Sequence, residues 1–447
     1  MQIHDILTLP VIDMNSEGRG ICKQDGMVIF VNHAVAGDRI RLQIRAVQKN
    51  FAEADCLEIL TPSENRVTPA CPWYAVCGGC TLGHVTREKE LSVKENTVRQ
   101  ALRRMHLDDK PDVFRPILAG KEYGYRNKAV FHADSDGNLG YFARESHEVI
   151  PGSFRCRLLP AVFADIAETV QDILHMKAGN LRLQSLYLRR NHENKCTVCL
   201  QTESSLTKKL QDQLMEYTRI LLSRHGEEII GVLHCDHPKG KYAVPNYTVL
   251  WGERYLHEIF HGLTMRLSPE GFCQVNHEGA EILAETVLSF AEQCAGKENM
   301  TAADLYCGSG FFGLHLAKAF PAWYIYGIEI NPDSISDAES NRTMNHLENI
   351  TFFCGDAADF TKKTGTKPQF VVIDPPRAGC SDKMCSQVMD FLPENIVYVS
   401  CNPHTLARDL TRFTAAEYEI KTVQPVDMFP GTEHVESVVC LAKCATR

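Results

Sequence analysis

The last third of the chain alternates short apolar segments with helical stretches. Before the first of these segments, a helix is predicted over Ala280 to Cys294, with Gly296 as the residue that stops it. The segments that predict strands are TAADLYC (301–307), YIYGIEI (324–330), ITFFCGD (350–356), FVVIDPP (370–376) and IVYVSC (396–401). Continuous apolar runs of this length are typical of parallel strands buried on both faces of a sheet. The pattern therefore predicts an α/β fold.

The first sixty residues follow a different period. Ile40, Leu42 and Ile44 alternate with polar residues, which predicts a half-buried strand with an arginine-rich opposite face. A second strand is expected over Met27 to Val31, and glycines mark the turns between strands. We expect a short β-barrel over residues 1–60. Its arginine-lined face suits RNA backbone, but it is equally compatible with an ordinary solvated strand face.

The middle of the chain mixes the two patterns. One helix is predicted over residues 87–106, and strand and helix patterns alternate irregularly from about 115 to 265. We therefore divide the 447 residues into a barrel over 1–60, a central α+β region over 61–265 and a catalytic α/β region over 266–447. A chain of this length, 44% hydrophobic, can bury more than one core.

Composition narrows the class of protein. No apolar run approaches the length of a membrane span, and the first residues lack a signal-type pattern, so we expect a cytoplasmic protein. In a reducing compartment, clusters among the 18 cysteines are expected to be metal-binding or catalytic. The net charge of −9 argues against a general polycation, but a local basic face can still bind nucleic acid.

Polar residues follow the ends of successive predicted strands. Gly308 lies in a glycine-rich turn, DLYCGSGFFG (304–313), and Glu329 ends the next strand. Asp356 and Asp374, in Gly-Asp and Asp-Pro-Pro, follow the third and fourth strands. Ligands of open α/β sheets bind at the carboxyl ends of the strands, and an acidic residue there can hold ribose hydroxyls. With no second nucleotide-binding half, S-adenosylmethionine fits better than a dinucleotide.

A group of cysteines lies far from this sheet in sequence. Cys71, Cys77 and Cys80 fall within CPWYAVCGGC (71–80), and Cys156 is the best candidate for a fourth ligand because it also lies in a loop. Four thiolates suit either a [4Fe–4S] cluster or zinc, and the uneven spacing disfavours a zinc ribbon. The remaining cysteines that we expect to be structural are Cys22, Cys56, Cys196, Cys199, Cys235, Cys273, Cys354 and Cys440.

One cysteine stands at a strand end of the catalytic region. Cys401 follows the fifth strand, so we expect it beside Asp374. C5 of a pyrimidine is too weak a nucleophile to take a sulfonium methyl group until a thiolate has added to C6, and a base must afterwards remove the C5 proton. Glu436, before a final strand that we expect to be antiparallel, is the candidate base, with Glu433 and His434 as rivals. Asp-Pro-Pro is followed by Arg377 and not by an aromatic residue, which argues against an exocyclic amine as methyl acceptor.

These motifs resemble the RNA uracil-5-methyltransferase family, specifically its branch with an N-terminal TRAM domain and a [4Fe–4S] cluster. The resemblance covers essentially the whole chain and rests on CPWYAVCGGC, FCQVN, DLYCGSG, DPPRAG, SCNP and HVE. It implies a class I methyltransferase sheet with Cys401 as nucleophile and Glu436 as base. The implied cluster ligands are Cys71, Cys77, Cys80 and Cys156. The implied S-adenosylmethionine contacts are Gln274, Tyr306, Gly308, Glu329, Asp356 and Asp374.

The resemblance also implies a substrate. This branch mostly modifies 23S ribosomal RNA, so we expect 5-methyluridine formation on an RNA loop whose target uridine is flipped out. No membrane and no obligate protein partner are expected, and the cluster is expected to shape the RNA surface without a redox step. Three alternatives stay open: a transfer-RNA uracil-5-methyltransferase, an RNA cytosine-5-methyltransferase, and a non-catalytic iron–sulfur RNA-binding protein.

Overall fold

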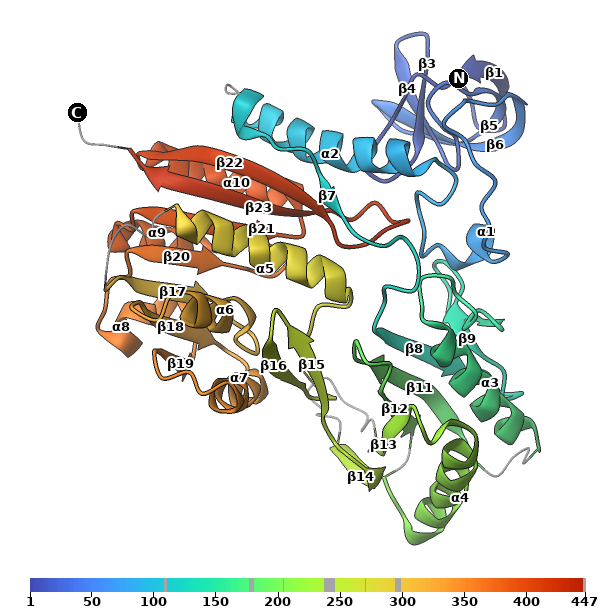
Figure 1. Cartoon of the computed structure of the whole chain (residues 1–447). Coiled ribbons are helices and arrows are strands. Elements are labelled where there is room, and N and C mark those ends of the chain that lie inside the picture. Colours follow the sequence, from blue (N-terminus) through green and yellow to red (C-terminus); the bar gives the residue numbers. More distant parts are fainter. Residues whose placement is uncertain are drawn as a thin grey trace.

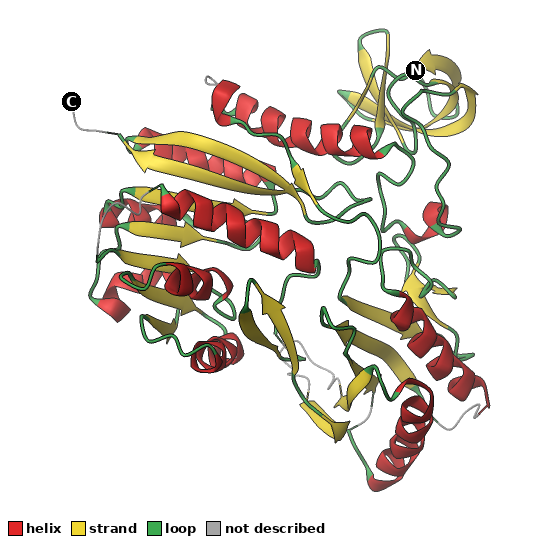
Figure 2. Cartoon of the chain, in the orientation of Figure 1, coloured by secondary structure: helices red, strands yellow, loops and turns green. Residues whose placement is uncertain are grey.

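Four sheets and the helices packed on them form the part of the chain that is described (Figures 1 and 2). The computed structural model describes residues 1–107, 111–176, 181–203, 205–236, 246–269, 271–293 and 299–444. In that part of the chain, no helix is both long enough and apolar enough to cross a bilayer.

The first sheet contains the N-terminal strands in the order β1-β5-β6-β4-β3-β2. Its strands are β1 (Ile6–Pro10), β2 (Asp13–Met14), β3 (Gly20–Gln24), β4 (Met27–Val31), β5 (Arg39–Val47) and β6 (Phe51–Thr61). The two strands predicted from sequence correspond to β4 and β5, and Ile40, Leu42 and Ile44 are buried in a core of their own.

Two arginines on the exposed face of β5 form ion pairs within the sheet. Arg41 forms an ion pair with Glu58 at 3.1 Å, and Arg45 forms one with Glu53 at 2.9 Å, both acids lying on the neighbouring strand β6. Exposed ion pairs of this kind are weak, so the RNA-binding and the solvated-face interpretations of this strand both stay predictions.

The second sheet has the order β10-β9-β8-β11-β12-β13-β14. Its strands are β8 (Lys128–Ala133), β9 (Leu139–Phe142), β10 (Val149–Pro151), β11 (Leu183–Arg190), β12 (Cys196–Thr202), β13 (Ile229–Asp236) and β14 (Asn246–Gly252). Helices α3 (Ala161–Met176) and α4 (Lys208–His225) share one apolar core with this sheet. The order of elements in this region, which the sequence pattern leaves open, is thus a mostly antiparallel sheet with two helices.

The C-terminal sheet has the order β19-β18-β17-β20-β21-β23-β22-β7. Its strands are β17 (Thr301–Leu305), β18 (Tyr324–Glu329), β19 (Ile350–Cys354), β20 (Phe370–Ile373), β21 (Asn395–Ser400), β22 (Tyr418–Asp427), β23 (Glu436–Lys443) and the short β7 (Leu118–Ala119). The strands β17 to β21 run parallel, as predicted, and β23 pairs antiparallel with β21.

Helices cover both faces of this sheet (Figure 1). Helices α2 (Arg87–Arg104), α9 (Asp382–Phe391) and α10 (Pro403–Ala415) contribute to the core on one face. Helices α5 (His277–Glu292), α6 (Phe311–Ala319) and α7 (Pro332–Met344) contribute to the core on the other. Two covered faces explain why these strands carry uninterrupted apolar residues.

The start of one helix differs from the sequence prediction. Helix α5 begins at His277, before the predicted Ala280, because the Asn276 side chain accepts a hydrogen bond from Gly279 N at 3.1 Å and caps the helix. The predicted end at Cys294 and Gly296 lies outside the described residues. The smaller elements are α1 (Tyr74–Cys77), η1 (Pro111–Val113), β15 (Leu256–Phe260), β16 (Leu263–Leu267), η2 (Ala357–Asp359) and α8 (Phe360–Thr364).

Helix α2 packs on the C-terminal sheet although it precedes the central sheet in sequence. Val98 and Leu102 lie in the same apolar core as Leu406 and Leu410 of α10. The fully buried Lys94 ammonium lies between Glu90 of the same helix, at 2.7 Å, and Asp427 at the end of β22, at 2.6 Å. The proposed domain borders at 60/61 and 265/266 stay predictions. Helix α2 belongs to the 61–265 region in sequence, but it packs on the sheet of the 266–447 region.

Candidate active site

Cys401 lies between a strand and a helix at the edge of the C-terminal sheet. Strand β21 ends at Ser400, and the Asn402 side chain caps α10 by accepting a hydrogen bond from His404 N at 3.0 Å. Pro403 occupies the first turn of that helix, where its missing N–H costs nothing and its fixed φ suits the geometry. The half-buried thiol is therefore held at a rigid strand-to-helix turn, next to the carboxyl end of β20.

Glu436 begins β23 on the other side of Cys401. The antiparallel register pairs Ser400 with Ser437, the residues next to Cys401 and Glu436, and the Glu436 carboxyl acts electrostatically on the Cys401 thiol. The Glu436 side chain is buried, with an exposed fraction of only 6%. The antiparallel last strand expected from sequence thus brings the candidate nucleophile and the candidate base together.

Burial and mutual repulsion set the charges of this group. Burial and the neighbouring Asp374 raise the pKa of the Glu436 carboxyl to about 8, against the opposing effect of the Arg377 guanidinium. Burial also raises the pKa of the Cys401 thiol to about 11, with Glu436 adding to the shift and Arg377 reducing it. The pKa of Asp374 rises to about 7 through burial and the neighbouring Asp304. The free site therefore holds more carboxylates than it can keep ionised at neutral pH.

Cys401 opens into a cavity of about 230 Å³. Arg377, Glu433 and His434 line it, and Arg377 Nη2 lies 3.3 Å from His434 Nε2. Asn402 Nδ2 donates to the Arg377 carbonyl oxygen at 3.2 Å, which ties the Asp-Pro-Pro-Arg loop to the Cys401 turn. The two rival bases thus share the cavity with Cys401, while Glu436 lies behind it.

Three residues in the wall of this cavity were not predicted from the sequence. Ser16 and Glu17 of the N-terminal sheet region and Thr97 of α2 also line it. No sequence pattern pointed to them, because each is an ordinary polar residue whose position depends on how the first and last parts of the chain pack together.

A second, smaller cavity of about 60 Å³ lies at the end of β17. Gln274, Tyr306, Gly308 and Asp374 all line it, so the structure brings together four of the six residues implied for S-adenosylmethionine. Tyr306 has a positive φ of 65°, an uncommon conformation for a residue with a side chain, at the turn that leaves β17. Phe311 also lines the cavity, with an apolar ring.

The other two acids lie on the neighbouring strand ends. One Glu329 carboxylate oxygen accepts a hydrogen bond from Gly308 N at 3.3 Å, so the end of β18 is tied to the glycine turn. Asp356 is exposed and accepts a hydrogen bond from Ala358 N at 2.8 Å, which caps η2. Asp304, which the sequence analysis did not assign, is fully buried and holds the turn by accepting from Gly313 N at 2.7 Å.

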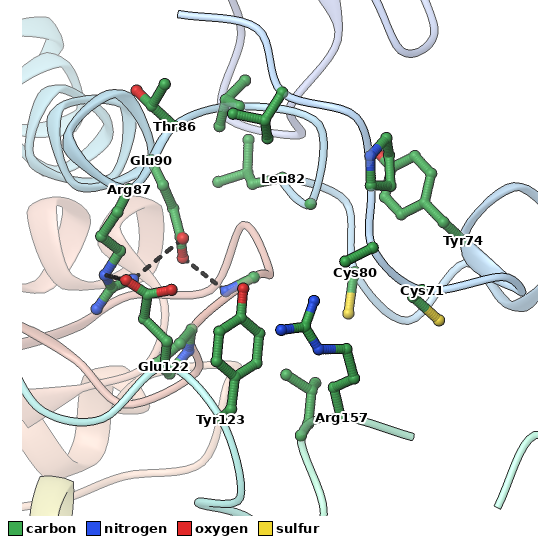
Figure 3. A pocket seen from close by; sticks show the side chains of 18 of the residues that line it. Cys71, Tyr74, Cys80, Leu82, Thr86, Arg87, Glu90, Glu122, Tyr123 and Arg157 are labelled. Carbon is green, nitrogen blue, oxygen red and sulfur yellow. Dashed lines mark hydrogen bonds and ion pairs between the residues drawn. The ribbon is translucent and has the colours of Figure 1, made fainter. Parts of the chain in front are cut away.

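The structure also gathers the cysteines predicted as metal ligands. Cys71, Cys80 and Cys156 line one cavity of about 340 Å³ between α1, the start of α2 and the loop after β22; Figure 3 shows Cys71 and Cys80 there. Burial raises the pKa of the Cys80 thiol to about 12, and Cys156, Cys71 and Cys77 each add to this rise. Within the described ranges, no three His, Cys, Asp or Glu side chains are arranged so that they could hold one metal ion.

The other cysteines follow the prediction with two exceptions. Cys196 and Cys199 are buried in different apolar clusters, as expected for strand positions that point to opposite faces. Cys22, Cys235 and Cys440 are buried, and Cys56 is partly buried. Cys354 is exposed at the end of β19, and Cys273 lines the cavity with Gln274, so neither simply fills a core.

Comparison with known proteins identifies the family. A model of the tRNA (uracil-5-)-methyltransferase family matches residues 87–444. The chain belongs to this family. An uncharacterized RNA methyltransferase of Halalkalibacterium halodurans is 32% identical over 463 residues, covering 98% of this chain and 97% of that protein. Another from Staphylococcus aureus strain MRSA252 is 32% identical over 461 residues and covers 97% of each chain.

A solved structure shares the fold over nearly the whole length. The crystal structure of Pyrococcus abyssi tRNA (uracil-54, C5)-methyltransferase in complex with S-adenosyl-L-homocysteine has a TM-score of 0.75 and 20% identity. The match covers 98% of this chain and 100% of that chain. The α/β methyltransferase fold with mixed sheets is thereby confirmed, and with the family the protein is an S-adenosylmethionine-dependent RNA methyltransferase.

The raised pKa of Glu436 predicts how the rate depends on pH. A base can accept a proton only when it is ionised, so kcat/KM is expected to rise steeply with pH up to about 8, the pKa of this carboxyl. Above that pH it should go on rising less steeply, because the fraction of Cys401 thiolate grows until the pKa of the thiol, about 11, is reached. In Arg377→Gln the inflection should move to higher pH, because the cation that opposes the shift is lost. A flat profile between about pH 6 and about pH 9 would contradict the assignment.

Proposed function

We propose that this protein methylates C5 of a uridine in RNA through a covalent adduct between Cys401 and C6 of the base. The observation that carries the proposal is the register of β21 and β23, which pairs the neighbours of Cys401 and Glu436, so that the buried carboxyl acts on the thiol. Both side chains interact electrostatically with Asp374, which lines the cavity at the glycine turn. These interactions support a nucleophile, a base and a methyl-donor site at one edge of the sheet.

In the proposed reaction, the Cys401 thiolate forms a bond to C6, and the C5–C6 π electrons move to give an enolate. C5 then attacks the sulfonium methyl group, and the electrons of the breaking S–CH₃ bond stay on sulfur. Glu436 accepts the C5 proton, the electrons of that C–H bond restore the C5–C6 double bond, and the C6–S bond breaks to release the Cys401 thiolate.

Arg377 is placed to assist the first step. Its guanidinium reduces the rise in pKa of both the Cys401 thiol and the Glu436 carboxyl. The side chain also borders the cavity into which Cys401 opens, where its planar donors suit a uracil carbonyl or a phosphate. We propose that Arg377 stabilises the thiolate and the enolate oxygen.

The S-adenosylmethionine site is proposed along the strand ends. The cavity beside Gln274 and Tyr306 is too small for the whole molecule, so it would hold one part, with Asp374 beside the sulfonium. The ribose hydroxyls would lie at Glu329, whose position is fixed by Gly308 N, and the adenine near Asp356. The positive sulfonium between raised-pKa carboxyls would favour their ionised forms.

Two substitutions test the covalent mechanism. Cys401→Ala is expected to lose 5-methyluridine formation, since no thiolate can activate C5. Glu436→Gln is expected to accumulate a protein–RNA adduct that survives denaturation, since the C5 proton cannot leave. Gel analysis of the adduct and mass spectrometry of nucleosides measure both outcomes.

Matched variants show whether these effects are specific. Cys444→Ala, an exposed cysteine after β23, should keep full activity. Glu433→Gln and His434→Gln separate the rival bases, because loss of the true base should stop release of 5-methyluridine altogether, whereas loss of a positioning residue should only slow it. Free 5-methyluridine from Glu436→Gln at the wild-type rate would reject Glu436, and 5-methylcytidine as the product would favour the cytosine-5 alternative.

For the RNA, we propose 23S ribosomal RNA, with transfer RNA as the second candidate. The N-terminal six-stranded sheet and the cysteine group support the TRAM-containing, cluster-containing branch. The names of the matching family model and of the Pyrococcus abyssi enzyme favour transfer RNA.

Mapping 5-methyluridine separates the two RNA classes. In cells that lack the gene, a uridine of 23S ribosomal RNA is expected to lose its methyl group, and the expression of active enzyme should restore it. The Cys401→Ala variant is the control that should not restore it. Loss of methylation only in transfer RNA would contradict the ribosomal proposal and support the second candidate.

We further propose that Cys71, Cys77, Cys80 and Cys156 hold a [4Fe–4S] cluster. Three of them line one cavity, and all three partners act on the Cys80 thiol, so the donor set and its convergence fit such a group. The thiolates of this cluster bind different iron atoms and need not approach one ion together. When bound, the cluster would cross-link the 71–80 loop to the loop that contains Cys156, without taking part in methyl transfer.

Iron analysis tests the cluster. Protein purified without oxygen is expected to contain iron and acid-labile sulfide in equal amounts, and Cys80→Ser should lose most of both. Cys199→Ser, in the central sheet, is the matched control that should retain them. Zinc in place of iron in the anaerobic protein would contradict the proposal.

A further inference from the structure

The segment that follows Cys80 runs beside the loop that leads to Glu436. Glu433 N donates a hydrogen bond to Thr81 Oγ1 at 2.8 Å, and the Thr81 hydroxyl donates in return to the Glu433 carboxylate. The next residue, Leu82, donates its N–H to the Gly431 carbonyl oxygen at 3.0 Å. Two residues separated by 352 positions are thus joined by a reciprocal pair of hydrogen bonds.

The same loop is fixed from its other side by α2. Glu90 accepts a hydrogen bond from Gly431 N at 2.7 Å, and Lys94 donates to the Phe429 carbonyl oxygen at 3.0 Å. Figure 3 shows Glu90 at the cavity that Cys71 and Cys80 line. These contacts hold residues 429 and 431 but not Glu433. Among the described residues, Glu433 forms both of its hydrogen bonds with Thr81, and His434 is an additional ion-pair neighbour at 3.9 Å.

Glu433 lies at the point where the loop enters the active site. It lines the cavity into which Cys401 opens, and His434 follows it in the same wall. Val435 is buried, and Glu436 begins β23 directly after it. A shift of Glu433 would therefore be transmitted along two residues to the base that faces Cys401.

We infer that Thr81 is a positioning residue for the proton-abstraction step: its hydroxyl fixes Glu433 and, through the loop, the placement of Glu436. This inference rests on the proposed covalent mechanism. It gives the segment after Cys80 a role in the reaction that depends on its hydroxyl group and not on what the thiols bind. A hydrogen bond to a carboxylate is among the stronger polar contacts in a protein, so its loss is large enough to alter a rate.

The test uses Thr81→Val, which keeps the shape of the side chain and removes the hydroxyl. We expect kcat to fall about tenfold, with the KM values for RNA and S-adenosylmethionine unchanged, and the denaturation-resistant RNA adduct to accumulate. Thr81→Ser restores the hydroxyl and should restore kcat. Thr343→Val, an exposed threonine on α7, is the matched control and should behave as wild type.

A double-mutant cycle with Glu433→Gln keeps the test decisive if Thr81→Val folds poorly. If Thr81 acts through Glu433, the double variant loses no more activity than the worse single variant. Wild-type kcat and no adduct in Thr81→Val, or additive losses in the cycle, would overturn the inference. The proposed function fails separately, if Cys401→Ala still forms 5-methyluridine or wild-type enzyme forms none.

Discussion

The placement of the active site depends on one buried ion network. Lys94, fully buried on α2, contacts Glu90 and Asp427, and Arg87 contacts the same two acids at 3.0 Å and 2.6 Å. Charges taken out of water are stable only when they are paired, and removal of one partner from such a pair costs about 3–5 kcal/mol. The network joins α2 to the end of β22, and so it fixes the start of the loop that leads to Glu436.

The loop that connects β22 to β23 forms further hydrogen bonds after Asp427. Asn276, the cap of α5, donates to the Met428 carbonyl oxygen at 3.0 Å, and Tyr125 donates to that of Pro430 at 3.2 Å. The loop therefore has contacts with the C-terminal helices, with the central region and with the cysteine segment. These contacts restrict the movement of the loop. This suits the proposed role of Glu436 as a base, since proton transfer is slow when the base is displaced from the atom that it must reach.

Electrostatics give the site a second constraint. Three buried acids lie near the strand ends, and burial raises the pKa of each carboxyl. The pKa is about 7 for Asp304, about 7 for Asp374 and about 8 for Glu436. A raised pKa means that the neutral acid is favoured in the fold, so these groups stabilise the free protein below their unfolded pKa and lose that contribution as pH rises through 7 to 8. A cation bound among them would reverse this preference, so a sulfonium at the proposed methyl-donor site would favour the ionised form of Glu436.

The sequence by itself determined the parallel sheet, its buried strands and the residues at their ends, because apolar runs and strand-end motifs are local patterns. It also pointed to Cys401 as a candidate nucleophile at a strand end, but it left Glu433, His434 and Glu436 as candidate bases, with Glu436 favoured by the family resemblance. Only the tertiary structure decided the register of β21 and β23 and the packing of α2 on the C-terminal sheet. The contact of Thr81 with Glu433, like the convergence of Cys156 with Cys71, Cys77 and Cys80, joins positions far apart in the chain. Such contacts depend on how whole sheets and helices pack, and no local pattern of residues encodes that.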